Sequence, residues 1–215
     1  MKADTQLVNA SKLNRTIFIR DNLEVLRCLE DKSVDLVYLD PPFNSNRNYG
    51  SPIGSKEAGF HFKDMWYLSD TDDAWWGELA NKNQKLYSIL RAIGLVNGDK
   101  DKSYLIYMTM RLIEMHRILK DTGSIYLHCD QVMSHSLKII MDAIFNKKKF
   151  LNEIVWCYDG MQSPSNKKFS TKNDIILRYC KDIKKVFVNK EGLYYEKEIE
   201  KESLKDYQKY RFMTL

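Results

Sequence analysis

The stretch Val34–Phe43, VDLVYLDPPF, decides the fold class of this chain. Its first six residues form a nearly continuous apolar run with β-branched valines, typical of a parallel-sheet strand buried on both faces. The strand has to end at Asp40, because Pro41 and Pro42 offer no N–H to a neighbouring strand. The sequence therefore predicts a buried strand whose carboxyl end carries Asp40, two prolines and Phe43.

The segments around this stretch alternate between strand-like and helix-like patterns. We expect strands at 15–20, 34–39, 124–129, 153–158, 174–180 and 184–188, and helices from Asp21, from Thr71, at 104–120 and at 130–145. Strands that alternate with helices favour right-handed crossovers between parallel strands. The sequence therefore predicts an α/β fold with a mostly parallel sheet and helices on both of its faces.

The residues at the strand end suit a particular chemistry. Ligands of such sheets bind at the carboxyl ends of the strands. Asp40 offers a hydrogen-bond acceptor there, the prolines present rigid carbonyl acceptors, and Phe43 offers a flat apolar face. Acceptors beside a stacking ring suit the exocyclic amine of a nucleobase that has left the duplex. The alternative is an ordinary Pro-Pro turn with a packed phenylalanine, and the position after a buried strand favours the functional interpretation.

The composition excludes several classes of protein. The chain has 215 residues, 44% of them hydrophobic, with no apolar run near the 18 or so residues of a membrane helix and no signal peptide, so we expect a cytoplasmic protein. The four cysteines form no CxxC pair, which argues against a zinc site and a disulfide framework. His128, Cys129 and Asp130 are adjacent on a predicted strand and point to opposite faces, so we expect no metal.

Positive charge concentrates in the segment 146–190. This segment holds eleven basic against four acidic residues, hence +7, whereas the whole chain carries +5. A cationic segment of this kind suits a phosphate backbone, and a solvated lysine-rich surface explains it equally well. The candidate DNA-binding residues are Lys147, Lys148, Lys149, Lys167, Lys168 and Lys172.

The order of these motifs resembles that of the bacterial DNA amino-methyltransferases with a DPPY or DPPF motif. The resemblance covers roughly residues 15–180 and is similar to the β class, in which the catalytic motif comes first. It is carried by DLVYLDPPFNSNRNY at 35–49, by Arg20-Asp21-Asn22, and by the segments 103–130, 150–156 and 170–179. One departure is Arg20, which stands where this family usually has glycine.

The resemblance implies a Rossmann-like methyltransferase fold and transfer of a methyl group from S-adenosylmethionine to the N6 amine of adenine in flipped-out duplex DNA. An aspartate in the first motif position favours adenine, while cytosine-N4 methylation and a non-catalytic DNA- or partner-binding subunit stay open. The implied catalytic residues are Asp40, Pro41, Pro42 and Phe43. The implied cofactor-binding residues are Asp21, Asn22, Asp40 and Pro41.

The resemblance also implies a further region after the target-recognition segment, with a glycine loop that binds the cofactor. None of the nine glycines lies in such a loop. We therefore expect 12–180 to be the catalytic part of an incomplete methyltransferase domain and 181–215 to be the start of a truncated recognition region. The expectation is a fragment that is inactive alone. Its expected partners are double-stranded DNA and a second methyltransferase chain, a missing C-terminal part or a restriction subunit.

Overall fold

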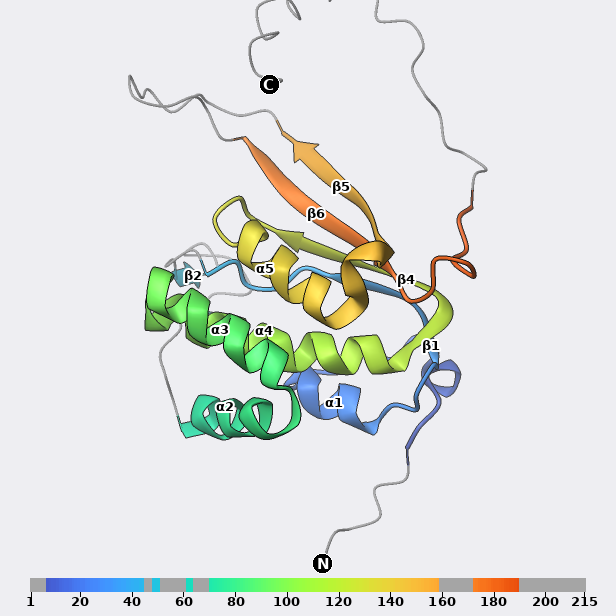
Figure 1. The fold of residues 1–215 in the computed structure, drawn as a ribbon. Coiled ribbons are helices and arrows are strands. Elements are labelled where there is room, and N and C mark those ends of the chain that lie inside the picture. Colours follow the sequence, from blue (N-terminus) through green and yellow to red (C-terminus); the bar gives the residue numbers. More distant parts are fainter. Residues whose placement is uncertain (1–6, 45–47, 51–60, 64–69, 159–171, 190–215) are drawn as a thin grey trace, which may run out of the picture.

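The computed structural model describes residues 7–44, 48–50, 61–63, 70–158 and 172–189 (Figure 1). The helices are α1 (Asn22–Cys28), α2 (Asp70–Lys82), α3 (Gln84–Asn97), α4 (Asp99–Ile118) and α5 (Ser134–Met141). Shorter helical turns are η1 (Ala10–Leu13), η2 (Asp142–Asn146) and η3 (Lys147–Lys149). The strands are β1 (Val34–Leu39), β2 (Asn48–Gly50), β3 (His61–Lys63), β4 (Leu119–Cys129), β5 (Phe150–Cys157) and β6 (Asn173–Cys180).

The four strands of the main sheet lie in the order β1-β4-β6-β5. This arrangement with its helices confirms the α/β class. The expectation of a mostly parallel sheet is wrong, because β1 and β4 are parallel whereas β6 is antiparallel to both β4 and β5. The reason for the antiparallel direction of β6 lies at the end of β5. There the Tyr158 N–H donates to the Lys172 carbonyl at 3.2 Å, so β6 starts at the sheet edge where β5 ends and runs in the opposite direction.

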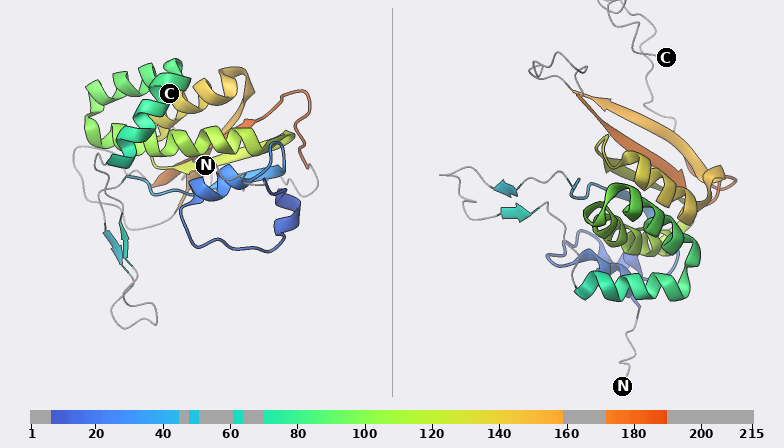
Figure 2. Two further views of the ribbon diagram at one scale, coloured as in Figure 1. Left: turned by 90° about the horizontal axis from the view of Figure 1, so that it is seen from below. Right: turned by 60° about the vertical axis from the view of Figure 1, so that its left-hand side comes forward.

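The two faces of the sheet differ in burial. One face contributes Ile125, Leu127 and Leu177, each fully buried, to a core shared with α1, α3, α4 and α5. The helices α3, α4 and α5 gather on this side of the sheet, as Figure 1 and Figure 2 show. The other face leaves Leu36 at 58% and Trp156 at 59% exposed. In the described part of the chain, helices thus cover one face, and the expectation of helices on both faces is not met there.

Two expected strands do not form. Residues 15–20 form no strand: Arg15 lies in a turn with a φ of 57°, and Ile17 and Ile19 are 87% and 98% exposed. Residues 184–188 are a turn and an irregular segment, held to the sheet through the Phe187 N–H, which donates to the Thr122 carbonyl at 3.1 Å. Apolar and β-branched residues favour a strand only where a partner strand packs beside them, which explains both differences.

The helices keep their expected places with different limits. The helix expected from Thr71 is two helices, because the side chain of Asn83 accepts a hydrogen bond from the Leu86 N–H at 3.2 Å and starts α3 anew. The helix expected at 104–120 already begins at Asp99 and ends at Ile118. The long helix α4 then leads directly into β4, whose carboxyl end carries part of the candidate site.

Candidate active site

Asp40 lies where the sequence places it, at the carboxyl edge of the sheet. Leu39, the last residue of β1, pairs with Leu127 of β4, so Asp40 comes to lie beside His128. The Asp40 side chain is 61% exposed, and its Oδ1 atom is 3.2 Å from Nδ1 of His128. Pro41 and Phe43, which follow, are half-buried. The edge therefore presents an accessible carboxylate next to a fixed turn.

His128 joins three elements of the site. Its Nε2 atom lies 3.3 Å from Oδ2 of Asp174 at the start of β6. Its ring also meets the ring of Phe43 edge-on, with 5.1 Å between the centroids. Asp40, Phe43, His128 and Asp174 thus converge at one place. Sequence reasoning missed His128 and Asp174 as site residues, because only the pairing of β4 with β6 reveals that they are neighbours.

Asn44 fixes the end of the turn that contains Asp40. Its φ of 61° lies in the left-handed region, which asparagine adopts more readily than most residues. The side chain is buried, and its amide donates to Oδ1 of Asp101 at 2.9 Å, while its backbone carbonyl accepts from Nζ of Lys100 at 3.2 Å. The turn is therefore tied to the first turn of α4. An asparagine directly after the DPPF motif was the available sign of this role.

A small cleft of about 190 Å³ opens next to Asp174. It is lined by Asp130, Gln131, Val132, Tyr158, Asn173 and Asp174. Asp130 is already engaged, because its Oδ1 atom accepts from the Met133 N–H at 2.9 Å. Gln131 bridges the two strands by donating from Nε2 to the Asn173 carbonyl at 3.3 Å. The cleft thus extends the Asp40 site along the carboxyl edge with polar walls and one exposed tyrosine.

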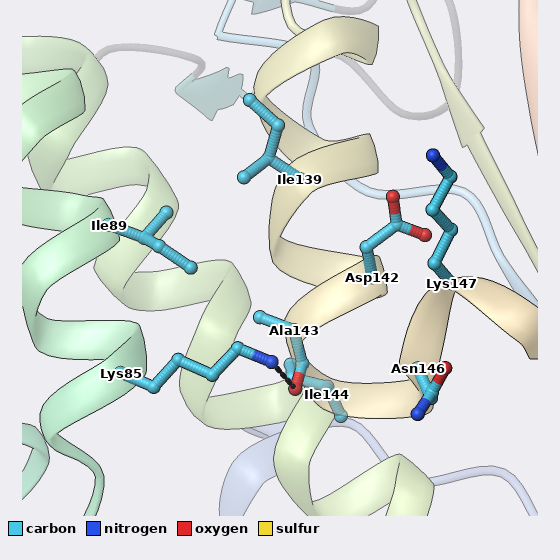
Figure 3. A pocket seen from close by; sticks show the side chains of 8 residues that line it. All are labelled: Lys85, Ile89, Ile139, Asp142, Ala143, Ile144, Asn146 and Lys147. Atoms are coloured by element: carbon cyan, nitrogen blue, oxygen red, sulfur yellow. Dashed lines mark hydrogen bonds between the residues drawn. The ribbon is translucent and has the colours of Figure 1, made fainter.

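A larger groove of about 550 Å³ lies between α3 and the α5–η2 segment and shares no lining residue with the Asp40 site. Across it, Nζ of Lys85 donates to the Ala143 carbonyl at 3.3 Å (Figure 3). Its carboxylate, Asp142, already accepts hydrogen bonds from Lys138 at 2.8 Å and from the Tyr179 hydroxyl at 2.7 Å. The groove therefore offers no set of reactive groups comparable to the edge at Asp40.

Asp21 and Asn22 begin α1 and bind a buried arginine. Oδ1 of Asp21 accepts from the Leu23 N–H at 2.7 Å and so caps the helix. Arg111 of α4 donates to Oδ2 of Asp21 at 2.7 Å and to Oδ1 of Asn22 at 2.8 Å. The Arg111 side chain is only 2% exposed and lies 3.3 Å from the ring centre of Tyr107. Burial lowers the pKa of Arg111, while Tyr107 and Asp21 oppose that shift.

The candidate DNA-binding lysines fall into separate places. Lys147, Lys148 and Lys149 form η3 directly before β5. Because β5 runs in the same direction as β1, this turn lies at the edge of the sheet opposite Asp40. Lys172 precedes β6 and lies at the Asp40 edge beside Tyr158. Lys167 and Lys168 lie outside the described residues. Of the described lysines, Lys147 to Lys149 and Lys172 therefore lie at opposite edges of the sheet.

The described residues also bear on metal binding, membrane spanning and thiol chemistry. No group of three or more His, Cys, Asp or Glu side chains within them is placed to hold a metal ion. None of the helices in that part of the chain is both long and apolar enough to cross a membrane. The four cysteines are unpaired, and burial raises the pKa of the Cys129 thiol to about 12, which keeps it protonated and unreactive.

Comparison with known proteins adds the family. Residues 34–214 match the family described as DNA methylase. The chain is similar to the type III restriction-modification enzyme StyLTI Mod subunit of Salmonella typhimurium, with 28% identity over 80% of this chain and 24% of that protein. The type II methyltransferase M.KpnI of Klebsiella pneumoniae is 29% identical over 82% of this chain and 35% of that protein. The DNA adenine methyltransferase YhdJ of Escherichia coli is 23% identical over 91% of this chain and 51% of that protein.

The chain thus spans about a quarter to a half of the length of these relatives. The family match contains β1, the turn from Asp40 to Asn44, and both partners of the site on β4 and β6. Three findings agree with one another: the family match, the α/β fold, and the acidic strand end that is followed by two prolines and an aromatic ring. The chain belongs to the DNA methylase family.

Proposed function

We propose that this chain carries the catalytic residues of a DNA methyltransferase that methylates the N6 amine of adenine with S-adenosylmethionine as methyl donor. The observation that carries the proposal is the exposed carboxylate of Asp40, which lies at the carboxyl edge of the sheet between strand β1 and a rigid Pro-Pro turn. Membership of the DNA methylase family and similarity to a DNA adenine methyltransferase support it. The relatives named as Mod subunits support a restriction subunit or a second methyltransferase chain as protein partner.

The residues at this edge meet the needs of an aromatic amine. The lone pair of such an amine is delocalised into the ring, so the nitrogen is a weak nucleophile. The Asp40 carboxylate accepts one N–H of the amine, and the Pro41 carbonyl offers a second acceptor in a fixed direction. Acceptors that are already in place stabilise the positive charge that develops on the nitrogen during methylation. Phe43 holds the plane of the base.

The residues present also fit the methyl donor. S-adenosylmethionine, when bound, supplies a methyl group on a positively charged sulfur. Asp40 and Pro41 would border this end, since the Asp40 side chain is 61% exposed and carries a negative charge. The family resemblance implies that Asp21 and Asn22 border the adenosine end, and Asp21 keeps 46% of its side chain exposed although Arg111 already binds it.

The test of the function is product analysis. Unmethylated duplex DNA is incubated with the protein and tritiated S-adenosylmethionine, with and without a candidate partner polypeptide, and the labelled nucleosides are separated. The proposal expects N6-methyladenine. Label in N4-methylcytosine would overturn the choice of adenine, and DNA binding without any incorporation would support a non-catalytic binding subunit.

Substitution of Phe43 tests its contact with the base. Phe43→Ala is expected to weaken kcat/KM for methyl transfer by an amount equivalent to about 1–3 kcal/mol, the usual contribution of a stacked base. Phe43→Tyr and Phe43→Trp keep an aromatic face and are expected to be much milder. The three variants are compared in the tritium assay. Equal losses for alanine and tryptophan would mean that stacking is the wrong explanation.

Substitution of the lysines tests the DNA contact. Charge reversal at Lys167 and Lys168 is expected to weaken binding to duplex DNA and to reduce the salt dependence by about two phosphate contacts. The matched control reverses Lys147 and Lys148, which lie at the sheet edge opposite Asp40, and a smaller change is expected there. Affinity is measured by fluorescence anisotropy from low to high salt. If charge reversal at Lys167 and Lys168 leaves the slope of DNA affinity against salt concentration unchanged, those lysines belong to the solvated surface.

A further inference from the structure

We infer that His128 is the positioning residue that orients the Asp40 carboxylate toward the substrate amine, and that Asp174 anchors His128 in turn. This inference rests on the proposed function, because orientation of Asp40 matters only if Asp40 meets an amine. It assigns a role in the reaction to two residues that lie on strands other than the one carrying the DPPF motif.

The geometry forms a chain of three side chains across three neighbouring strands. The His128 ring lies between two carboxylates, with Nδ1 3.2 Å from Asp40 and Nε2 3.3 Å from Asp174. The exposed fraction of the side chain is 61% at Asp40 but only 18% at His128 and 22% at Asp174. The accessible carboxylate is therefore held from behind by two side chains that are largely buried.

The backbone on which this chain stands is also fixed. His128 pairs with Ile176 in the β4–β6 ladder, and Ile176 is 7% exposed. Asn173, the residue before Asp174, accepts at its carbonyl from Gln131 at 3.3 Å. Phe43 meets the His128 ring edge-on and limits its rotation. A ring held from three sides has little freedom to turn away from Asp40.

The physical need for such a partner follows from the exposure of Asp40. A solvated carboxylate rotates freely about its side-chain bonds, and each orientation that misses the amine lowers the rate. The Nδ1 atom of His128, 3.2 Å from Oδ1 of Asp40, holds that oxygen and leaves the second oxygen to accept from the substrate. The opposite ring nitrogen, Nε2, faces Asp174, so the two carboxylates hold the two ends of the His128 ring.

Two amide variants separate this role from a purely structural one. The amide nitrogen of His128→Asn lies near the place of Nδ1 and retains a donor toward Asp40. The amide nitrogen of His128→Gln lies near the place of Nε2 and retains a donor toward Asp174. A positioning role expects His128→Gln to lose about 10- to 100-fold in kcat and His128→Asn to lose less, no more than Asp174→Ala, with KM for DNA nearly unchanged in both. A role confined to joining β4 and β6 expects the opposite order.

The experiment measures kcat, KM and thermal unfolding for these two variants, for Asp174→Ala and for Asp40→Ala, in the protein together with whatever partner gives turnover. Asp174→Ala is expected to lower kcat while KM stays the same, and an unchanged kcat would overturn the anchoring role. If both His128 variants keep full kcat while Asp40→Ala loses turnover, the inference fails and the proposed function stands. If Asp40→Ala itself keeps turnover, the proposed function fails as well.

Discussion

Replacement of Asp40 by alanine is expected to reduce kcat for methyl transfer by about 100- to 1,000-fold, the usual cost of removing one fixed polar group that stabilises developing charge. The physical reason is the loss of the acceptor that holds the amine N–H. The stability of the fold should change little, because the Asp40 side chain is 61% exposed and its neighbour His128 keeps its contact with Asp174.

The control for Asp40 is the asparagine variant. Asp40→Asn retains one oxygen acceptor in nearly the same place and loses the negative charge, so its kcat should fall between those of the alanine variant and the native protein. Tritium incorporation gives the rates, and thermal unfolding followed by circular dichroism verifies the fold. Near-normal turnover of Asp40→Ala would remove the basis of the proposed chemistry.

Replacement of Asp21 by serine is expected to lower the free energy of unfolding by about 3 kcal/mol, although the Asp21 side chain is nearly half exposed. Serine still caps α1, so the loss isolates the effect of the charge. Its cause lies in Arg111, whose guanidinium is 2% exposed and would stay buried without its carboxylate. The remaining acceptors, Asn22 and the Tyr107 carbonyl, carry no charge, which is why the cost stays large.

The matched variants are Arg111→Met alone and combined with Asp21→Ser. Methionine fills much of the arginine volume without charge, so the single variant should cost less than Asp21→Ser, since it leaves only a half-exposed carboxylate unpaired. The double variant should recover most of the stability lost by Asp21→Ser. Urea unfolding measures all three. A double variant whose loss equals the sum of the single losses would show that Asp21 and Arg111 do not stabilise each other.

The same experiment bears on the cofactor. If Asp21→Ser reduces stability while its affinity for S-adenosylmethionine, measured by calorimetry at a temperature where it is folded, is native, Asp21 supports α1 alone. A large loss of affinity in the folded variant would support the expectation, drawn from the family resemblance, that Asp21 borders the adenosine end. Arg111 gives the residue a structural role in either case.

The sequence by itself determined the features that depend on neighbouring residues. The run Val34–Leu39 is a strand because it is largely apolar and β-branched, and it ends at Leu39 because Asp40 is followed by two prolines. Local periodicity likewise predicted most of α4 and residues 124–129 of β4, which led to the α/β class, although β4 already begins at Leu119. The site at Asp40 was found in this way, since its motif is contiguous along the chain.

Only the tertiary structure decided the features that depend on which segments meet. His128 and Asp174 are 46 positions apart, and Asn44 and Asp101 are 57 apart, so no local pattern connects them. The antiparallel direction of β6, the exposed segment 15–20 and the single covered face of the sheet also depend on pairing partners. The physical reason is that a strand's direction and register are fixed by hydrogen bonds and packing with another strand, which its own residues do not specify.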